Sequence, residues 1–275
     1  MASQSGGLPP IVPAFAYMCG PGLAGIIMAF IYHRGSVADV LGLKLKGTKQ
    51  QWLWLGISYL IGMGIIVGAL LISLLGPGVG LQDPLTGTAQ MMRDAGQNPD
   101  MLNVVPMMGV ILILQWALLA PLLNIPLMLS EELGWRGWLW SHLRGHPRWG
   151  GFWTTSLITG LLWGLWHVPI ILAGHNYPEA PQIGAVVFTL FCILYAPLFT
   201  LVREKTNSVW GPCVLHATTN GAAAISIVML TNPPVLWKGI VGLGGFIAMA
   251  VGIVFIWRFY RPEAVLDNQR VTPAA

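Results

Sequence analysis

The chain has few charged residues. Asp, Glu, Lys and Arg make up 9% of its 275 residues and apolar residues 55%, whereas soluble domains carry about 25% charged residues. This shortage excludes an ordinary soluble domain and predicts a polytopic membrane protein in a lipid bilayer. The net charge of +4 does not indicate nucleic acid as a partner, because the basic residues are scattered between apolar runs and form no stripe with aromatic residues.

The sequence also lacks the cysteine patterns of a disulfide framework or a zinc cluster. Its three cysteines, Cys19, Cys192 and Cys213, lie inside apolar segments and show no CxxC spacing. We therefore expect them to be small apolar side chains within the fold.

Long apolar runs are abundant instead. About 20 apolar residues are needed for a helix to cross about 30 Å of hydrocarbon, and irregular backbone cannot face lipid. The predicted fold is therefore all-α, a bundle of about seven to eight transmembrane helices in a single integral membrane domain, residues 1–275. The seven predicted runs are Ile11–Tyr32, Trp52–Leu75, Val104–Ser130, Phe152–Ala173, Ile183–Val202, Val209–Leu230 and Lys238–Trp257.

The basic residues predict how these helices are oriented. Short loops rich in lysine and arginine stay on the cytoplasmic side. Twelve of the 14 lysines and arginines fall in the first, third and fifth loops and the C-terminal tail, and the other two are Arg93 and Lys238. This asymmetry predicts an N-terminus outside and a cytoplasmic C-terminus. The Gly-, Pro- and Asp-rich segment from Gly76 to Asn103 is predicted to be an external polar connector.

Two adjacent carboxylates stand where the third apolar run ends, in the sequence SEELGWRG. A charge near the bilayer centre costs about 2.5 to 3.5 kcal/mol, so it needs a partner. Glu132 and Arg136 are four residues apart and share a helical face, which predicts an ion pair. Glu131 is rotated by about 100° from Glu132 and faces another neighbour. The pattern suggests one structural and one working glutamate, although both acids could instead lie at the cytoplasmic interface.

Two further runs carry polar residues. His167 has no other ionisable residue in its run, and a lone histidine of this kind is often a hydrogen-bonded core residue, although it is also a candidate for function. His216 and Asn220 are four residues apart and share one face. Three helices that each contribute polar groups to an apolar bundle are difficult to explain by packing alone.

These residue types can hydrolyse a peptide bond without a covalent nucleophile. A carboxylate beside a histidine in a dry cavity can take a proton from water, which then attacks a carbonyl. The resulting oxyanion needs fixed donors, and a histidine and an asparagine on one helical face can supply two. Glu131, His167, His216 and Asn220 are the predicted catalytic residues on this basis.

The three segments together resemble the CPBP family of intramembrane proteases, which includes CAAX prenyl endopeptidases and Abi-type proteins. The resemblance covers about residues 110–225, the predicted protease core. The family motifs are EExxxR, FxxxH and HxxxN, and the second departs from the pattern because tryptophan replaces phenylalanine. The matching residues are Glu131, Glu132, Arg136, Trp163, His167, His216 and Asn220.

The resemblance implies endopeptidase activity within the membrane on membrane-anchored peptides or proteins, prenylated or CAAX-like substrates included. It also implies that Glu131 and His167 activate water, that His216 and Asn220 stabilise the oxyanion, and that Glu132, Arg136 and Trp163 support them.

A metal ion is the alternative to a metal-free general base. If zinc is present, Glu131, His167 and His216 are its candidate ligands, with an open position for water. The sequence has no HExxH motif. His142 and His146 have helical spacing, but a glycine and a proline flank the second histidine and break the helix that would align them. We therefore favour catalysis without a cofactor.

Two other classes of function remain open. Buried acids and histidines could form the proton relay of a coupled transporter, although no inverted repeat supports it. A non-catalytic membrane scaffold in peptide or bacteriocin immunity is the third class. The short loops are compatible with a bacterial cytoplasmic membrane.

Overall fold

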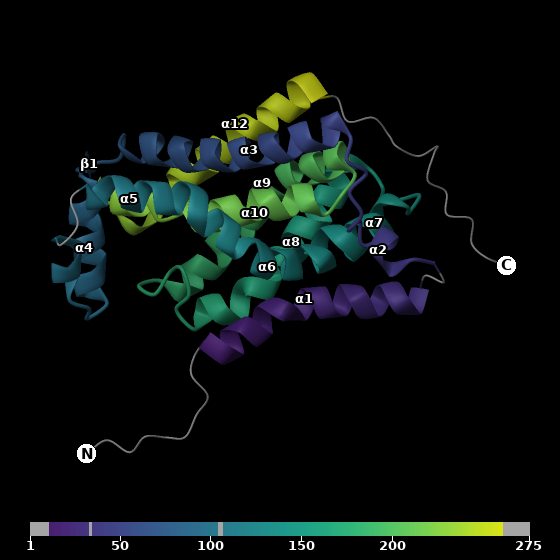
Figure 1. Ribbon diagram of the computed structural model, residues 1–275, viewed down its shortest axis with the longest axis horizontal. Helices are drawn as coiled ribbons and strands as arrows, with labels where there is room; N and C mark the ends of the chain where they lie inside the picture. The colour runs from purple at the N-terminus through teal and green to yellow at the C-terminus, as the bar shows by residue number, and fades with distance from the viewer. Residues whose placement is uncertain (1–10, 33–34, 104–106, 261–275) are drawn as a thin grey trace, which may run out of the picture.

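The protein is a bundle of helices, as Figure 1 shows for the computed structural model. The structure describes residues 11–32, 35–103 and 107–260. The predicted helical class is confirmed, with one small addition: the two-residue strands β1 (Gly80–Leu81) and β2 (Leu230–Thr231) pair antiparallel.

The long separate helices are α1 (Ile11–Tyr32), α3 (Lys49–Ser73), α8 (Phe152–Leu172) and α9 (Pro181–Thr206), and the shorter α12 (Leu243–Phe255) continues into a π-helical turn. A continuous helical segment joins five elements, two of them π-helical: α5 (Met108–Leu114), η2 (Gln115–Leu119), α6 (Ala120–Glu132), η3 (Leu133–Leu139) and α7 (Trp140–Arg144). The remaining elements are α2 (Val37–Val40), α4 (Pro84–Asp94), η1 (Pro99–Asn103), α10 (Trp210–Ala222), α11 (Ile225–Val228), η4 (Val235–Trp237) and the π-helical η5 (Ile256–Tyr260).

Five helical segments are long and apolar enough to cross a membrane. They correspond to five of the seven predicted runs, and the third of these runs was predicted to begin at Val104, outside the described residues. The five segments are Lys49–Ser73, Met108–Arg144, Phe152–Leu172, Pro181–Thr206 and Leu243–Tyr260. The protein is therefore a membrane protein with several apolar spans.

The predicted count of seven to eight spans is not confirmed. The first run forms α1, whose segment Ala16–Tyr32 is apolar but shorter than the five spans. The run predicted as the sixth crossing, Val209–Leu230, is interrupted: α10 has 13 residues and is followed by the four-residue α11 and β2. At about 1.5 Å per residue, α10 alone is too short to cross the hydrocarbon. Both chain termini, including Arg261 and Arg270, and also Arg34 lie outside the described residues.

The predicted polar connector after α3 has regular structure. It contains α4, which begins after Asp83, and the Asp83 carboxylate accepts a hydrogen bond from the backbone N–H of Thr86. The hydroxyl of Thr86 also donates to this carboxylate, and these bonds lower the pKa of Asp83. A side-chain acceptor at the first turn stabilises a helix, and this local signal explains why a short helix forms in a polar segment.

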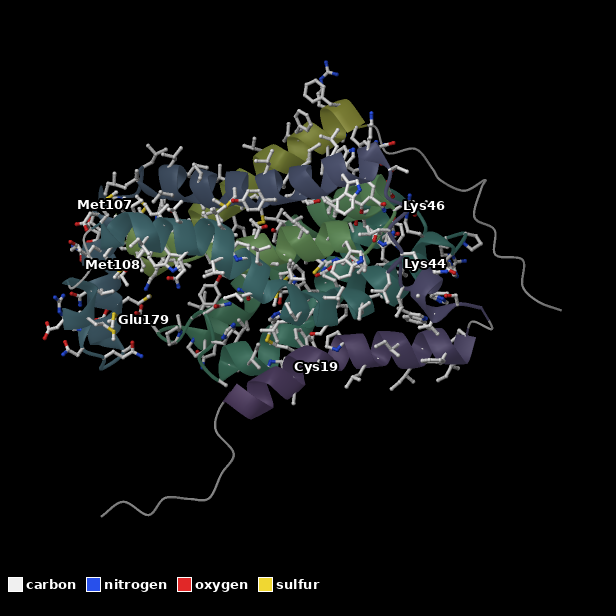
Figure 2. The ribbon with its side chains drawn as sticks, viewed as in Figure 1. Cys19, Lys44, Lys46, Met107, Met108 and Glu179 are labelled. Atoms are coloured by element: carbon white, nitrogen blue, oxygen red, sulfur yellow. The ribbon has the colours of Figure 1, made fainter. Side chains whose placement is uncertain are left out.

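Two of the basic loop residues that were used to predict orientation lie at one end of the bundle. Figure 2 shows Lys44 and Lys46 at the end where α2 and α7 lie, and Glu179, Met107 and Met108 toward the opposite end. Helix α4 also lies at this second end.

The core lies where α8, α9 and α10 pack side by side in the centre of the bundle (Figure 1). Its largest buried side chains include Trp163, Tyr195 and Phe199. Cys192 and Cys213 are also fully buried and free, as expected, whereas Cys19 is only half-buried. The functional motifs lie around this aromatic core.

Helix α1 packs closely on the segment that carries the two glutamates. A β-carbon at Gly22 would lie 2.2 Å from the backbone oxygen of Ser130, the residue before Glu131. The Ser130 hydroxyl donates a hydrogen bond to the backbone oxygen of Met18. Any larger residue at Gly22 must therefore push α1 away from α6.

We expect Gly22→Ala to destabilise the protein by about 1 to 3 kcal/mol, because the clash is with backbone and cannot be relieved by a rotamer change. Thermal unfolding in detergent measures the effect. Gly56→Ala on α3 is the matched control, since a β-carbon there meets nothing within 4 Å and alanine is the better helix former. A Tm for Gly22→Ala at or above that of Gly56→Ala would contradict the close packing of α1.

Candidate active site

Three ionisable residues of the first motif are completely enclosed. Glu131 is 2% exposed, Glu132 0% and Arg136 1%. Glu131 and Glu132 end α6, and Arg136 lies in the π-helical turn η3 that follows. Single π-helical turns are frequent at functional sites. The two glutamates thus face the protein interior, and so does Arg136, which was counted among the basic loop residues that predict orientation.

Glu132 has two cationic or potentially cationic partners. Its Oε1 accepts from Arg136 Nη1 at 2.9 Å and from His216 Nδ1 at 2.8 Å, and its Oε2 lies 3.2 Å from the same Arg136 nitrogen. The predicted ion pair with Arg136 is confirmed. The Arg136 guanidinium also lies 3.9 Å from the ring centroid of Phe199, a cation–π contact that adds to its stabilisation.

The contact with Glu132 fixes which nitrogen of His216 carries a proton. A carboxylate only accepts hydrogen bonds, so Nδ1 must be the donor. The second nitrogen, Nε2, is then an acceptor in the neutral ring and a donor in the imidazolium. Only the imidazolium form could donate from Nε2 to an oxyanion.

Glu131 has a different environment. Its Oε2 accepts a hydrogen bond from the indole Nε1 of Trp163 at 3.2 Å. The charged groups of Glu132, Arg136 and His216 act on it electrostatically, but no cation forms a hydrogen bond with it among the described residues. One glutamate is therefore neutralised by direct partners, and the other keeps a carboxylate that can accept a proton.

His167 lies on the same helix as Trp163, one turn later, and is 8% exposed. Its Nδ1 is 2.9 Å from the backbone oxygen of Trp163, so Nδ1 donates and Nε2 is the free acceptor. Its ring packs against Trp166 and Phe188, with centroid distances of 4.6 and 4.7 Å. The imidazole is thus held in one orientation by a hydrogen bond and by aromatic contacts.

Asn220 is the one predicted catalytic residue that is exposed. It lies one turn after His216 on α10, and its Nδ2 is 2.9 Å from Sδ of the fully buried Met128. Met128 precedes Glu131 by three residues. Asn220 therefore lies at the rim of the cluster, while the other predicted residues lie inside it.

Trp163 is the residue that joins the cluster together. Its ring centroid is 5.2 Å from that of His216 and 5.8 Å from that of His167, and its N–H reaches Glu131. The structure thus brings Glu131, Glu132, Arg136, Trp163, His167 and His216 together from α6, η3, α8 and α10.

Tyr17 of α1 also borders the site, and no sequence motif indicated it. Its ring stacks on Trp166 with a centroid distance of 4.5 Å, and its hydroxyl donates to the backbone oxygen of Trp166. The charge of Glu131 acts on it. A tyrosine in an apolar run resembles any interfacial aromatic residue, so only the packing of α1 on α6 reveals its position.

Metal ligation was the alternative role for Glu131, His167 and His216. Within the described part of the chain, no three His, Cys, Asp or Glu side chains are grouped so that they could hold a metal ion. His216 Nδ1 is already used by Glu132.

Comparison with known proteins agrees with the motifs. Residues 106–222 match the profile of a family described as type II CAAX prenyl endopeptidase Rce1-like. The comparison with curated proteins gave no match. The matched segment contains all three motifs together with the residues that the structure gathers around Trp163. Residues 106–222 of the chain are thus similar to the Rce1-like type II CAAX prenyl endopeptidases, a family of proteases.

Proposed function

We propose that this protein is an intramembrane endopeptidase that uses Glu131 to activate water against peptide bonds of membrane-anchored, prenylated CAAX-like substrates. The observation that carries the proposal is the difference between the two adjacent glutamates. Glu132 is bound by Arg136 and His216, whereas Glu131 is buried with a neutral indole donor. A family of CAAX prenyl endopeptidases matches this segment.

The proposed reaction starts with a water molecule between Glu131 and His167. Its two protons point to the Glu131 carboxylate and to His167 Nε2, which are both acceptors. Glu131 takes one proton as the oxygen attacks the peptide carbonyl, and a tetrahedral oxyanion forms. Glu131 then returns the proton to the leaving amine as the C–N bond breaks, which leaves a carboxylic acid and an amine. The acid proton, which was the second proton of the water, then passes to the amine, so the final products are a carboxylate and an ammonium group.

The oxyanion is stabilised by His216 and Asn220 in this proposal. The His216 imidazolium, held by Glu132 through Nδ1, donates from Nε2, and Asn220 donates from its amide. Fixed donors in a water-poor site are worth about 2.7 to 4 kcal/mol each to the transition state. Because Asn220 is exposed at the rim, it is within direct reach of an incoming peptide.

We propose the orientation with the N-terminus outside and the C-terminus in the cytoplasm of a bacterial cytoplasmic membrane. The clustering of Lys44 and Lys46 at the end that carries α2 and α7 supports it (Figure 2). Helix α1 begins at the opposite end (Figure 1). Lysine-rich loops stay on the cytoplasmic side.

Cleavage by the purified protein in liposomes tests the function. The substrate is a fluorescent peptide that ends in farnesylated cysteine, two aliphatic residues and methionine, a prenylation motif. We expect cleavage of this peptide and slower cleavage of the same peptide without the lipid. A proton-coupled transporter or a peptide-immunity scaffold would leave both peptides intact.

We expect the protease activity to survive removal of divalent metals. The physical reason is the donor set, since His216 Nδ1 is bound to Glu132 and the acids and histidines are not grouped as metal ligands among the described residues. The measurement is turnover after dialysis against a chelator, with zinc add-back. Activity that disappears with the chelator and returns with stoichiometric zinc would contradict the proposed general-base mechanism.

A further inference from the structure

Trp163 is placed to control both members of the proposed water-activating pair. It is 2% exposed, and its indole N–H donates to Glu131 Oε2 at 3.2 Å. Its backbone oxygen accepts from His167 Nδ1 at 2.9 Å. One residue therefore contacts a carboxylate of α6 through its side chain and an imidazole of α8 through its backbone.

We propose that Trp163 is a positioning residue that orients the Glu131 carboxylate toward the same water that His167 holds. The inference rests on the proposed function, because it assigns a role in that same site. Among the described hydrogen bonds, the indole N–H is the donor that Glu131 receives from a side chain. Phenylalanine, which has no such donor, could fill the space but could not orient the carboxylate.

The neighbouring arginine explains why Glu131 needs this donor. Arg136 acts electrostatically on Glu131, and its Nη2 is buried without a hydrogen-bond partner in the described structure. A Glu131 carboxylate that lost the indole bond would be drawn toward that free N–H group. Glu131 would then form an ion pair with Arg136, as Glu132 does, and it would no longer be available as a base.

The packing of the indole supports a fixed orientation. Its ring centroid lies 4.6 Å from the Arg136 guanidinium carbon and 5.4 Å from the centroid of the Phe199 ring. It also meets the rings of His216 and His167 edge to face. These contacts hold the ring from several sides, so the N–H direction cannot change without repacking the core.

The test compares Trp163→Phe with Trp116→Phe in the farnesylated-peptide assay. Trp116 is 9% exposed and belongs to the same aromatic core, but it lies in η2, away from the glutamates. Hydrogen bonds to charged groups contribute about 1.5 to 3 kcal/mol, so we expect kcat/KM to fall roughly ten- to a hundredfold for Trp163→Phe. The fall should be in kcat, with KM little changed.

The pH profile separates positioning from packing. The charged and titratable groups around Glu131 include Glu132 and Arg136 on its own segment, His216 on α10, His167 on α8, Cys192 on α9 and Tyr17 on α1, and all of these are retained in the variant. Replacement of the neutral indole by the Arg136 guanidinium as the partner of Glu131 should therefore move the acid limb of kcat/KM to lower pH, by roughly one unit, because an opposite charge stabilises the carboxylate. Trp116→Phe should leave the limb in place.

A second variant separates loss of the indole hydrogen bond from misfolding of Trp163→Phe. Benzothienylalanine at position 163 replaces the indole N–H by sulfur and keeps the size of the ring. It should reproduce the slower kcat and the shifted acid limb at an unchanged Tm. Wild-type kcat, or an acid limb that does not move, would overturn the role of Trp163 while leaving the proposed function intact. Full activity of Glu131→Gln would instead contradict the proposed function itself.

Discussion

Glu131→Gln is expected to lower kcat at least about a thousandfold, near the upper range for loss of a general base. Glutamine has the same shape, and its amide oxygen can still accept the hydrogen bond from Trp163. It cannot take a proton from water. The substitution therefore removes the chemical step and leaves the packing of α6 unchanged, so we expect a Tm within a few degrees of the wild type.

The measurement is single-turnover cleavage of the farnesylated peptide in liposomes, with thermal unfolding of each protein. Glu179→Gln is the matched control, because it makes the same chemical change in an exposed loop at the far end of the bundle (Figure 2). It should retain wild-type turnover. Equal turnover by Glu131→Gln and Glu179→Gln would show that Glu131 is not the general base.

Glu132→Ala has the largest expected effect on stability. The alanine leaves the buried Arg136 guanidinium without its carboxylate and removes the acceptor for His216 Nδ1. Breaking a buried ion pair from one side costs about 3 to 5 kcal/mol. Because many domains are stable by only about 5 to 15 kcal/mol, we expect a strong fall in Tm, poor recovery from the membrane and no activity.

A double substitution distinguishes the two roles of Glu132. Glu132→Met with Arg136→Met removes both charges, and apolar replacement of a buried pair is often neutral or stabilising. We expect the double variant to recover most of the lost Tm but no activity, because His216 has lost its acceptor. Recovery of turnover together with Tm would show that Glu132 serves only to neutralise Arg136.

The sequence could predict contacts within one helix. The spacing of Glu132 and Arg136 predicts their ion pair, and the structure confirms it. The second partner of Glu132, His216, lies 84 positions away on α10, and no local period shows which helices face each other. For this reason Glu132 appeared from the sequence to pair with Arg136 alone.

Apolar length predicted most of the helices but not their interruptions. Five of the predicted runs form segments long enough to cross a membrane. The run Val209–Leu230 has the apolar length of a span, yet α10 ends at Ala222. Its continuation is set by tertiary contacts, because Leu230 and Thr231 pair with the connector strand β1. Composition cannot show such a contact.

The exposure of Asn220 and the position of Tyr17 also could not be predicted from the sequence. The spacing of His216 and Asn220 places both on one helical face, but the structure buries the first and exposes the second. A spacing of four residues shows that two side chains point in the same direction from the helix axis. It does not show whether both are covered by neighbouring helices. Tyr17 comes near Glu131 because α1 packs closely on α6, an approach that glycines such as Gly22 permit.

Mass spectrometry of the farnesylated peptide after incubation with the protein in H₂¹⁸O detects whether water that Glu131 activates cleaves the peptide bond. We expect two fragments from the wild type, with one solvent oxygen in the new carboxylate, and an intact peptide with Glu131→Gln. The new termini identify the bond that is cleaved. An intact peptide with folded wild-type protein, or the same labelled fragments from Glu131→Gln, would contradict hydrolysis by water that Glu131 activates.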